Sequence, residues 1–153
     1  MGASAPDLWQ IIASPDSLLK SHPFLANNPV SHWNKADSRD EVHYLRGLVY
    51  RREFRQWHEG DGYDLEIFHR RRPVSWVSWR VMPVGDRAAR LRITVFPYAF
   101  QEKHALIRWA PYAFVLRPRL RAYLKSVVGG FKWYVENGTP VPRNHFGTHP
   151  WFS

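Results

Sequence analysis

Hydrophobic and polar residues alternate along the middle of the chain, in a pattern typical of β-strands. In residues 63–69, Tyr63, Leu65 and Ile67 share one side of the chain and acidic residues take the other. The same period of two recurs in the neighbouring segments, and turn sequences such as EGDG at 59–62 separate them. Connections this short predict an antiparallel meander. The expected strands are residues 29–34, 41–47, 48–58, 63–69, 74–82 and 89–97.

Helical patterns flank these strands. Asp7 is a candidate cap for a helix over 8–13, and Ser14-Pro15 favours a second helix over 15–20. A third, much longer amphipathic pattern covers 118–136 and ends at Asn137-Gly138. Its apolar stripe consists of Leu120, Leu124, Val127, Val128, Phe131 and Val135. Since one face of the sheet is apolar and needs a cover, we expect this helix to lie across it.

The pattern therefore predicts an α+β fold with a curved antiparallel sheet of about six strands, two short N-terminal helices and a long C-terminal helix. We expect residues 1–138 to form a single domain. We expect residues 139–153 to form an extended tail, because their prolines disfavour a helix. The tail also carries large aromatic side chains, so we expect it to pack on the domain or on a partner.

Composition narrows the class of protein. With 153 residues, 44% of them hydrophobic, the chain is long enough for one domain with one core. It contains no cysteine, which excludes disulfides, thiol nucleophiles and zinc–thiolate sites. The N-terminus has no signal-peptide pattern and no apolar run is long enough to span a bilayer. We therefore expect a cytoplasmic protein.

The net charge of +9 permits binding to anionic partners. Arginine is concentrated at 70–72 (RRR) and at 117–121 (RPRLR), and the other basic residues are scattered. A solvated basic surface explains this distribution as well as binding does. We expect no specific nucleic-acid recognition, and transient contact with an anionic membrane stays open.

Two adjacent glycines, Gly129 and Gly130, interrupt the C-terminal helix pattern. Each glycine in a helix interior costs about 1 kcal/mol relative to alanine. A kink, a close helix contact, or a molecule that fits against the bare backbone would each account for the pair.

Three segments resemble the START-related, polyketide cyclase/dehydrase and lipid-transport (SRPBCC) superfamily, which has the helix-grip fold. These are DLWQIIASPDSLLKSHPF near the N-terminus, the hairpin RVMPVGDRAARLRITVFP, and the closing amphipathic helix. The resemblance covers about residues 6–136. Members usually begin with a strand before the first helix, and only a few residues precede Asp7 here. Either that strand is absent, which would leave an open sheet edge where a second subunit could form a homodimer, or the true start of the chain lies upstream.

The resemblance implies a deep cavity between the sheet and the C-terminal helix that receives a hydrophobic or amphipathic molecule. The glycine pair would then leave room for that ligand, or for a large ring of a filled core. No cofactor is implied. The expected cavity residues are Phe24, Arg52, Phe54, Tyr63, Leu65, Ile67, Trp76, Trp79, Arg80, Leu91, Ile93, Val127, Gly130 and Phe131.

Polar residues in apolar surroundings are the candidates for chemistry. Arg52 and Arg80 lie on otherwise apolar strands, so an inward-pointing one needs a partner, either an anionic ligand or Glu53 or Glu66. No GxSxG motif is present, which argues against a common hydrolase. His145 and His149 are expected on the surface of the tail, and we expect no metal site. The acid–base candidates are His22, Tyr50, Tyr63 and His69.

Three hypotheses follow for function. A carrier or binding domain for a hydrophobic small molecule predicts a closed apolar cavity of a few hundred Å³ without a convergent acid–base pair. An aromatase/cyclase-type enzyme predicts titratable groups that face one another in that cavity, with perturbed pKa values. A binder of nucleic acid or anionic membrane predicts that the two arginine-rich segments converge on one patch. We favour the binding domain over an enzyme.

Overall fold

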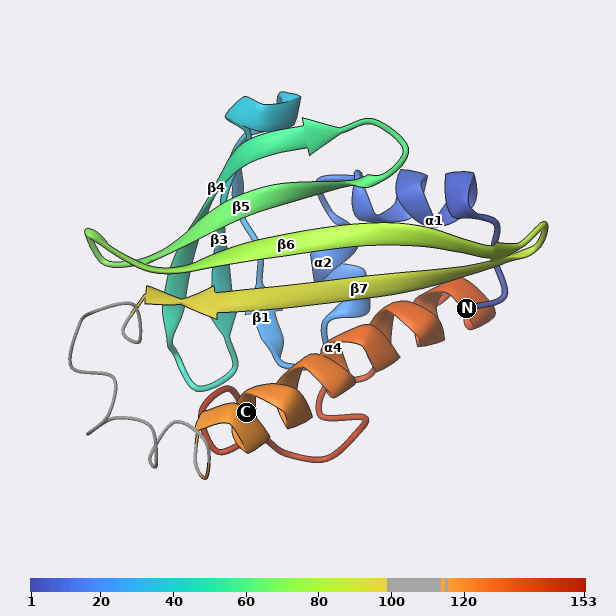
Figure 1. The fold of residues 1–153 in the computed structure, drawn as a ribbon. Helices are drawn as coiled ribbons and strands as arrows, with labels where there is room; N and C mark the ends of the chain where they lie inside the picture. The colour runs from blue at the N-terminus through green and yellow to red at the C-terminus, as the bar shows by residue number, and fades with distance from the viewer. Residues whose placement is uncertain (99–113, 115) are drawn as a thin grey trace.

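The computed structural model describes residues 1–98, 114 and 116–153, and their elements follow the predicted order (Figure 1). Two short helices, α1 (Ala5–Ile12) and α2 (Ser17–Ser21), come first, and a long helix, α4 (Arg117–Asn137), follows the sheet. Between them lie β1 (Leu25–Asn27), β2 (Val30–His32), the 3-10 turn η1 (Lys35–Asp37), β3 (Arg39–Tyr44), β4 (Val49–His58), β5 (Gly62–His69), β6 (Arg72–Gly85) and β7 (Ala88–Pro97).

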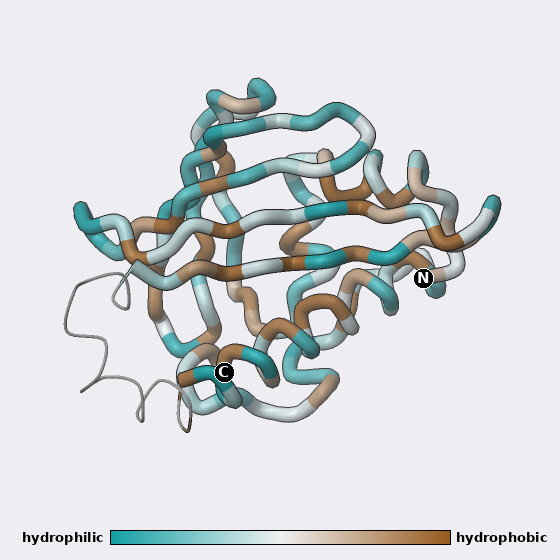
Figure 2. The backbone as a smooth tube through the Cα atoms, viewed as in Figure 1, coloured by the Kyte–Doolittle hydropathy of each residue, from teal (hydrophilic) through white to brown (hydrophobic). Residues whose placement is uncertain are grey.

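The strands form one antiparallel sheet in the order β1-β3-β4-β5-β6-β7, with β2 beside β3. The sheet curls around α4, which runs diagonally across its inner side, so the predicted α+β helix-grip fold is confirmed (Figure 1). Alternation sets the register as expected: Val77, Trp79 and Val81 of β6 are all buried on the inner side. Hydrophobic and hydrophilic segments alternate visibly along β6 and β7 (Figure 2).

Some boundaries differ from the sequence-based expectations. Helix α1 begins at Ala5 and its cap is Ser4, whose hydroxyl accepts from the Asp7 amide at 3.3 Å, rather than Asp7 itself. The strand β1 and the turn η1 were not predicted, because three residues are too few to show a period. Among the described residues, no helix has the length and apolar character needed to cross a bilayer.

Strand β7 is the last strand of the sheet, and no other described strand pairs with its outer edge. Met1 pairs with this edge: its ammonium donates to the Ala89 carbonyl at 3.1 Å, and its carbonyl accepts from the Ala89 amide at 3.3 Å. Beyond Ala89, no described strand pairs with this edge, which lies next to α4.

The interpretation of Gly130 as a space for a ligand is wrong. A Cβ atom on Gly130 would overlap the carbonyl oxygen of Ser21, at the end of α2. A Cβ atom on Gly129 would instead lie 3.1 Å from the ring of Phe146, in the C-terminal tail. Gly130 therefore permits close packing of α4 against α2, which is the second of the three explanations considered above.

The C-terminal tail lies against the domain. The amides of Val141 and Asn144 donate to the carbonyls of Lys20 and Pro23, both at 2.9 Å. Further along, the Phe152 ring is buried against two tyrosines of the domain. His149, expected on the surface, is also buried, because its ring stacks on Phe152 and its Nε2 lies 3.1 Å from the Arg119 carbonyl oxygen.

Candidate functional site

A small internal cavity lies between the inner side of the sheet and α4, with a volume of about 60 Å³. Apolar side chains from the sheet and the helix form most of its wall, and one polar cluster faces it from the side of α2. Such a volume accommodates a few water molecules, at about 10–15 Å³ each. The lining residues are Leu18, His22, Val42, Tyr44, Tyr50, Arg52, Leu65, Ile67, Val77, Trp79, Ile93, Val95, Tyr123, Leu124 and Val127.

The sequence located the cavity in part. Two of the acid–base candidates, His22 and Tyr50, also line it. The predicted cavity residues that do line it are Arg52, Leu65, Ile67, Trp79, Ile93 and Val127.

Four other predicted cavity residues fill the core instead of lining a free space. Phe24, Phe54, Tyr63 and Phe131 are each at most 2% exposed. Tyr63, for example, stacks on Trp79 with ring centroids 5.6 Å apart. The cavity is consequently smaller than the few hundred Å³ that the carrier hypothesis predicts, because aromatic rings occupy much of the interior.

The remaining predicted residues lie elsewhere. Trp76 and Arg80 are on the outer side of the sheet, opposite Val77 and Trp79 in the alternation, and Arg80 donates to Asp64 at 2.7 Å. Leu91 lines a separate surface groove beside α4.

Two acid–base candidates lie outside the cavity wall. The His69 ring lies 5.3 Å from the Tyr50 ring, behind the lining. Tyr63 belongs to the packed core described above.

Arg52 points inward. From the sequence, an inward Arg52 is expected to pair with an anionic ligand, Glu53 or Glu66, but its partner is neither of these glutamates. Asp40, fully buried on β3 opposite Arg52, accepts from Arg52 Nε at 2.7 Å and from Nη2. Burial alone would lower the pKa of Arg52, and the adjacent Asp40 carboxylate raises it instead. The pair is therefore an internal ion pair, so Arg52 does not require an anionic ligand.

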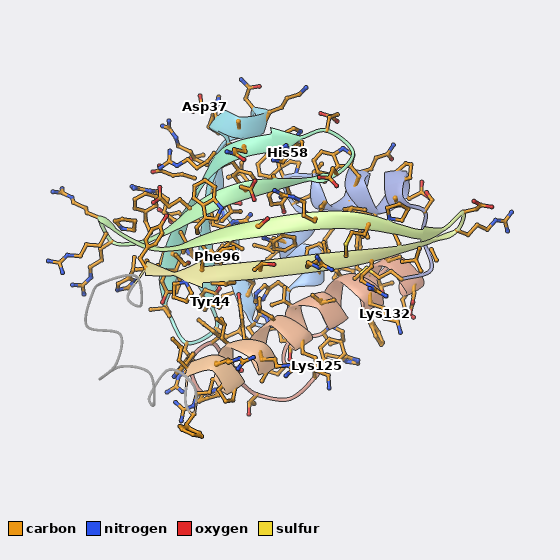
Figure 3. The ribbon with its side chains drawn as sticks, viewed as in Figure 1. Asp37, Tyr44, His58, Phe96, Lys125 and Lys132 are labelled. Carbon is orange, nitrogen blue, oxygen red and sulfur yellow. The ribbon has the colours of Figure 1, made fainter. Side chains whose placement is uncertain are left out.

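A chain of three polar side chains faces the cavity. His22 Nε2 lies 2.9 Å from the Tyr123 hydroxyl, and that hydroxyl lies 2.7 Å from the hydroxyl of Tyr44. Tyr44 lies on the α4 side of the sheet (Figure 3). The other ring nitrogen of His22, Nδ1, accepts from the Phe24 amide at 3.2 Å. Because an amide can only donate, the proton of the neutral imidazole is on Nε2, which donates to Tyr123.

The surroundings hold all three groups in their neutral forms. Burial, and secondarily the charge of Arg52, lower the pKa of His22 to about 3. Burial raises the pKa of Tyr123 to about 12 and raises the pKa of Tyr44 well above its usual value. At neutral pH the chain His22–Tyr123–Tyr44 is a series of hydrogen-bond donors, and the last O–H is free to point at an oxygen atom in the cavity.

This arrangement is suited to holding a carbonyl or phenolic oxygen within an apolar site. It is less suited to removing a proton, because His22 already carries its proton on Nε2 and no carboxylate lines the cavity among the described residues. The described residues also contain no group of three or more metal-ligating side chains.

Sequence reasoning missed three of the polar residues at this site. Tyr44 comes two residues after Val42 in the expected strand 41–47, so both side chains lie on the same, inward-facing side of the strand. Tyr123 stands four residues before Val127, a spacing that places both on one helix face. Nothing in the sequence identifies Asp40 as the partner of Arg52, because the pairing depends on the register of two strands.

No family model matches the chain, and no curated protein matches its sequence. Solved structures do share the fold. DynU16, a protein of the dynemicin biosynthetic locus, aligns with a TM-score of 0.67 and 16% identity over 92% of this chain and 46% of its own. This chain thus spans about half the length of DynU16.

Two enzymes share the same fold. Zhui aromatase/cyclase from Streptomyces sp. R1128 aligns with a TM-score of 0.57 and 13% identity, over 92% of this chain and 93% of Zhui. Norcoclaurine synthase from Thalictrum flavum, in complex with dopamine and hydroxybenzaldehyde, aligns with a TM-score of 0.55 and 13% identity, over 90% and 83%. These likenesses confirm the helix-grip fold that the resemblance predicts.

Proposed function

We propose that this protein binds a small hydrophobic molecule carrying a carbonyl or phenolic oxygen, in the cavity between the sheet and α4. The observation that carries the proposal is the donor chain His22–Tyr123–Tyr44, which opens on an otherwise apolar wall. Buried hydroxyl groups are unfavourable unless they are paired, so their position on a cavity favours a guest with an acceptor atom.

The fold supports this proposal at a coarser level. Norcoclaurine synthase, which has the same fold, holds two small oxygenated aromatic molecules. In this chain such a guest must enlarge the cavity of about 60 Å³, by displacing side chains of α4 or of the sheet. Ligand binding is therefore coupled to movement of the cavity wall.

Matched probes test the proposal. Acetophenone and α-methylstyrene have nearly the same shape, but only acetophenone has a carbonyl oxygen. We expect calorimetric titration to give about three- to tenfold tighter binding of acetophenone, the effect of one hydrogen bond. Tyr44→Phe should remove this preference, because the Tyr44 hydroxyl is the last donor of the chain and the one that is free to meet the guest oxygen. Failure of both probes to bind would overturn the proposal.

Two adjacent valines of α4 supply matched variants. Val127 lines the cavity, whereas Val128 lines only the surface groove. We expect Val127→Phe to abolish acetophenone binding by filling the cavity, and Val128→Phe to leave it unchanged. Circular dichroism and thermal unfolding establish that both variants are folded, since a larger core side chain costs about 1–3 kcal/mol.

A cyclase-type enzyme is the second candidate, and it is favoured by the same donor chain. Donors aimed at a carbonyl oxygen stabilise the negative charge of an enolate, the first intermediate of an aldol cyclisation, which forms here when hydroxide from the solvent takes the α-proton and becomes water. The enzyme hypothesis requires titratable groups that face one another with perturbed pKa values. His22, Tyr44 and Tyr123 meet this requirement. Exchange of the acetophenone methyl protons for deuterium in D₂O separates the candidates: acceleration by the protein favours the enzyme, and the buffer rate favours binding alone.

A further inference from the structure

A long groove runs along the surface between the open edge of β7 and α4. It consists of two adjoining hollows, of about 810 Å³ and about 630 Å³. The hollows share part of their walls, namely Arg90 and Leu91 of β7 and Lys125 and Val128 of α4. The groove exists because no described strand covers the outer edge of β7 beyond its pairing with Met1.

The groove is apolar along its floor and basic along its rim. No carboxylate lines it within the described part of the chain, and no described carboxylate forms an ion pair with its basic residues. Two of these bases, Lys125 and Lys132, extend from α4 (Figure 3). The floor includes Leu91, Ile93, Leu120, Leu124 and Val128. The rim carries Arg90, Arg92, Arg117, Arg121, Lys125 and Lys132.

Two of the basic residues lie at the N-terminal end of α4, where the helix dipole disfavours positive charge. Arg117 and Arg121 lie in the first turns of α4, where the helix dipole favours acidic side chains, and the first turn contains none. Arg119, between them, faces away from the groove, with its guanidinium over the Trp151 ring. The cations on the groove side thus add to the positive potential of the helix terminus, which an anionic group would offset.

The groove and the internal cavity share two walls. Ile93 of β7 and Leu124 of α4 line both the cavity and the hollow nearer the start of α4. These two side chains lie between the mostly apolar cavity and the groove with its basic rim. A molecule longer than the cavity therefore has a continuous apolar path from Tyr123 past Ile93 and Leu124 to the cations of the rim.

We infer that the ligand is an elongated anionic amphiphile, whose apolar end enters the cavity and whose acidic group lies in the groove near Arg121 and Lys125. This inference rests on the proposed function, because it extends the same site. It names the chemical class of the ligand, a carboxylate or phosphate on a hydrocarbon chain. It also explains how a cavity too small for such a chain contributes to its binding.

Probes with one chain and different head groups test the inference. We expect decanoate to bind about tenfold more tightly than 1-decanol at low salt, and decyltrimethylammonium to bind least. The preference should fall to about two- to threefold at 1 M salt, where the Debye length is about 3 Å. Decanoate should also displace acetophenone, because the two share the cavity. Equal affinities for decanoate and 1-decanol, or binding of decanoate without displacement, would overturn the inference.

Charge-matched variants separate the groove from the overall charge. Arg121→Gln with Lys125→Gln removes two groove cations, and Arg71→Gln with Arg143→Gln removes two exposed cations outside it. We expect the first pair to weaken decanoate binding about tenfold and the second pair by less than about twofold. Equal losses would mean that only net charge acts. Val128→Phe, which fills the groove floor, should weaken decanoate but not acetophenone.

The two proposals fail in different ways. If acetophenone does not bind, the proposed function fails whatever decanoate does. If acetophenone binds but decanoate gains nothing from its charge, the inference alone fails. Vesicles of phosphatidylcholine with phosphatidylglycerol distinguish a free amphiphile from a lipid surface. If the protein is retained on these vesicles but does not bind free decanoate, the inference of a soluble ligand is overturned.

Discussion

At the scale of single residues, the site depends on the protonation of His22. Its Nδ1 accepts from a backbone amide and its Nε2 faces a tyrosine hydroxyl, so the neutral ring satisfies both contacts. Protonation would leave the Nδ1 proton pointing at the amide of Phe24, in a buried site that Arg52 already makes positive. The same contacts that make His22 a donor to the cavity therefore oppose its ionisation.

This opposition makes stability depend on pH. The pKa of His22 is about 3 in the folded protein, below its ordinary value of 6.5, so the unfolded chain binds a proton first as pH falls. Stability from the neutral ring is complete above about pH 6.5 and is lost progressively toward pH 3. Between about pH 7.5 and pH 4.5 this amounts to about 2–3 kcal/mol.

Denaturant unfolding of the wild type and His22→Gln at both pH values measures this term. We expect the wild type to lose about 2–3 kcal/mol more than the variant over this interval, since glutamine does not titrate and the other groups are common to both. Equal pH dependence of the two proteins would show that His22 is not held neutral by the fold.

At the scale of elements, the periodicity of the sequence predicts the strands and helices well, but it does not predict which of them are in contact. The period of two located β4 to β7, and the helical period placed α4 within a residue of its observed bounds, Arg117–Asn137. Partners distant in the chain were not predictable, because they depend on how the elements pack. His22 and Tyr123 are 101 residues apart, and the Ser21 carbonyl that requires Gly130 lies on a different helix.

The two glycines of α4 test that packing. Gly130→Ala should destabilise the protein by about 2–4 kcal/mol, because the added methyl group overlaps the Ser21 carbonyl and forces α4 away from α2. Gly129→Ala should change stability by less than about 1 kcal/mol, since the better helix propensity of alanine offsets a close contact with the Phe146 ring, which is 44% exposed and free to shift. Chemical denaturation of both variants checks the difference, and equal effects would contradict the close approach of the two helices.

At the scale of the whole molecule, both ends of the chain complete the domain around the site. Met1 pairs with the free edge of β7 beside the groove, and the tail from Val141 to Phe152 lies along α2 and α4. The Arg46 guanidinium donates to the Pro150 carbonyl at 2.5 Å and holds the tail at the turn between β3 and β4. The tail thus closes the end of the interior where the donor chain lies. The aromatic residues of the tail predicted that it packs on the domain or on a partner, but they did not predict which surface it covers.

Phe152 should be the residue through which the tail closes the site. Its ring centroid lies 4.4 Å from both the Tyr44 and Tyr123 rings, so Phe152→Ala removes the cover from two members of the donor chain. We expect a loss of about 3–5 kcal/mol in the free energy of unfolding, typical of a buried phenylalanine, and a faster association of acetophenone with the opened interior. The matched control is Phe146→Ala in the same tail, whose exposed ring should account for less than about 1 kcal/mol and leave association unchanged. Stopped-flow binding and denaturant unfolding measure the two effects separately. A large loss of stability with an unchanged association rate would mean that the tail supports the fold without controlling entry, and ligands would then enter between Ile93 and Leu124, from the groove.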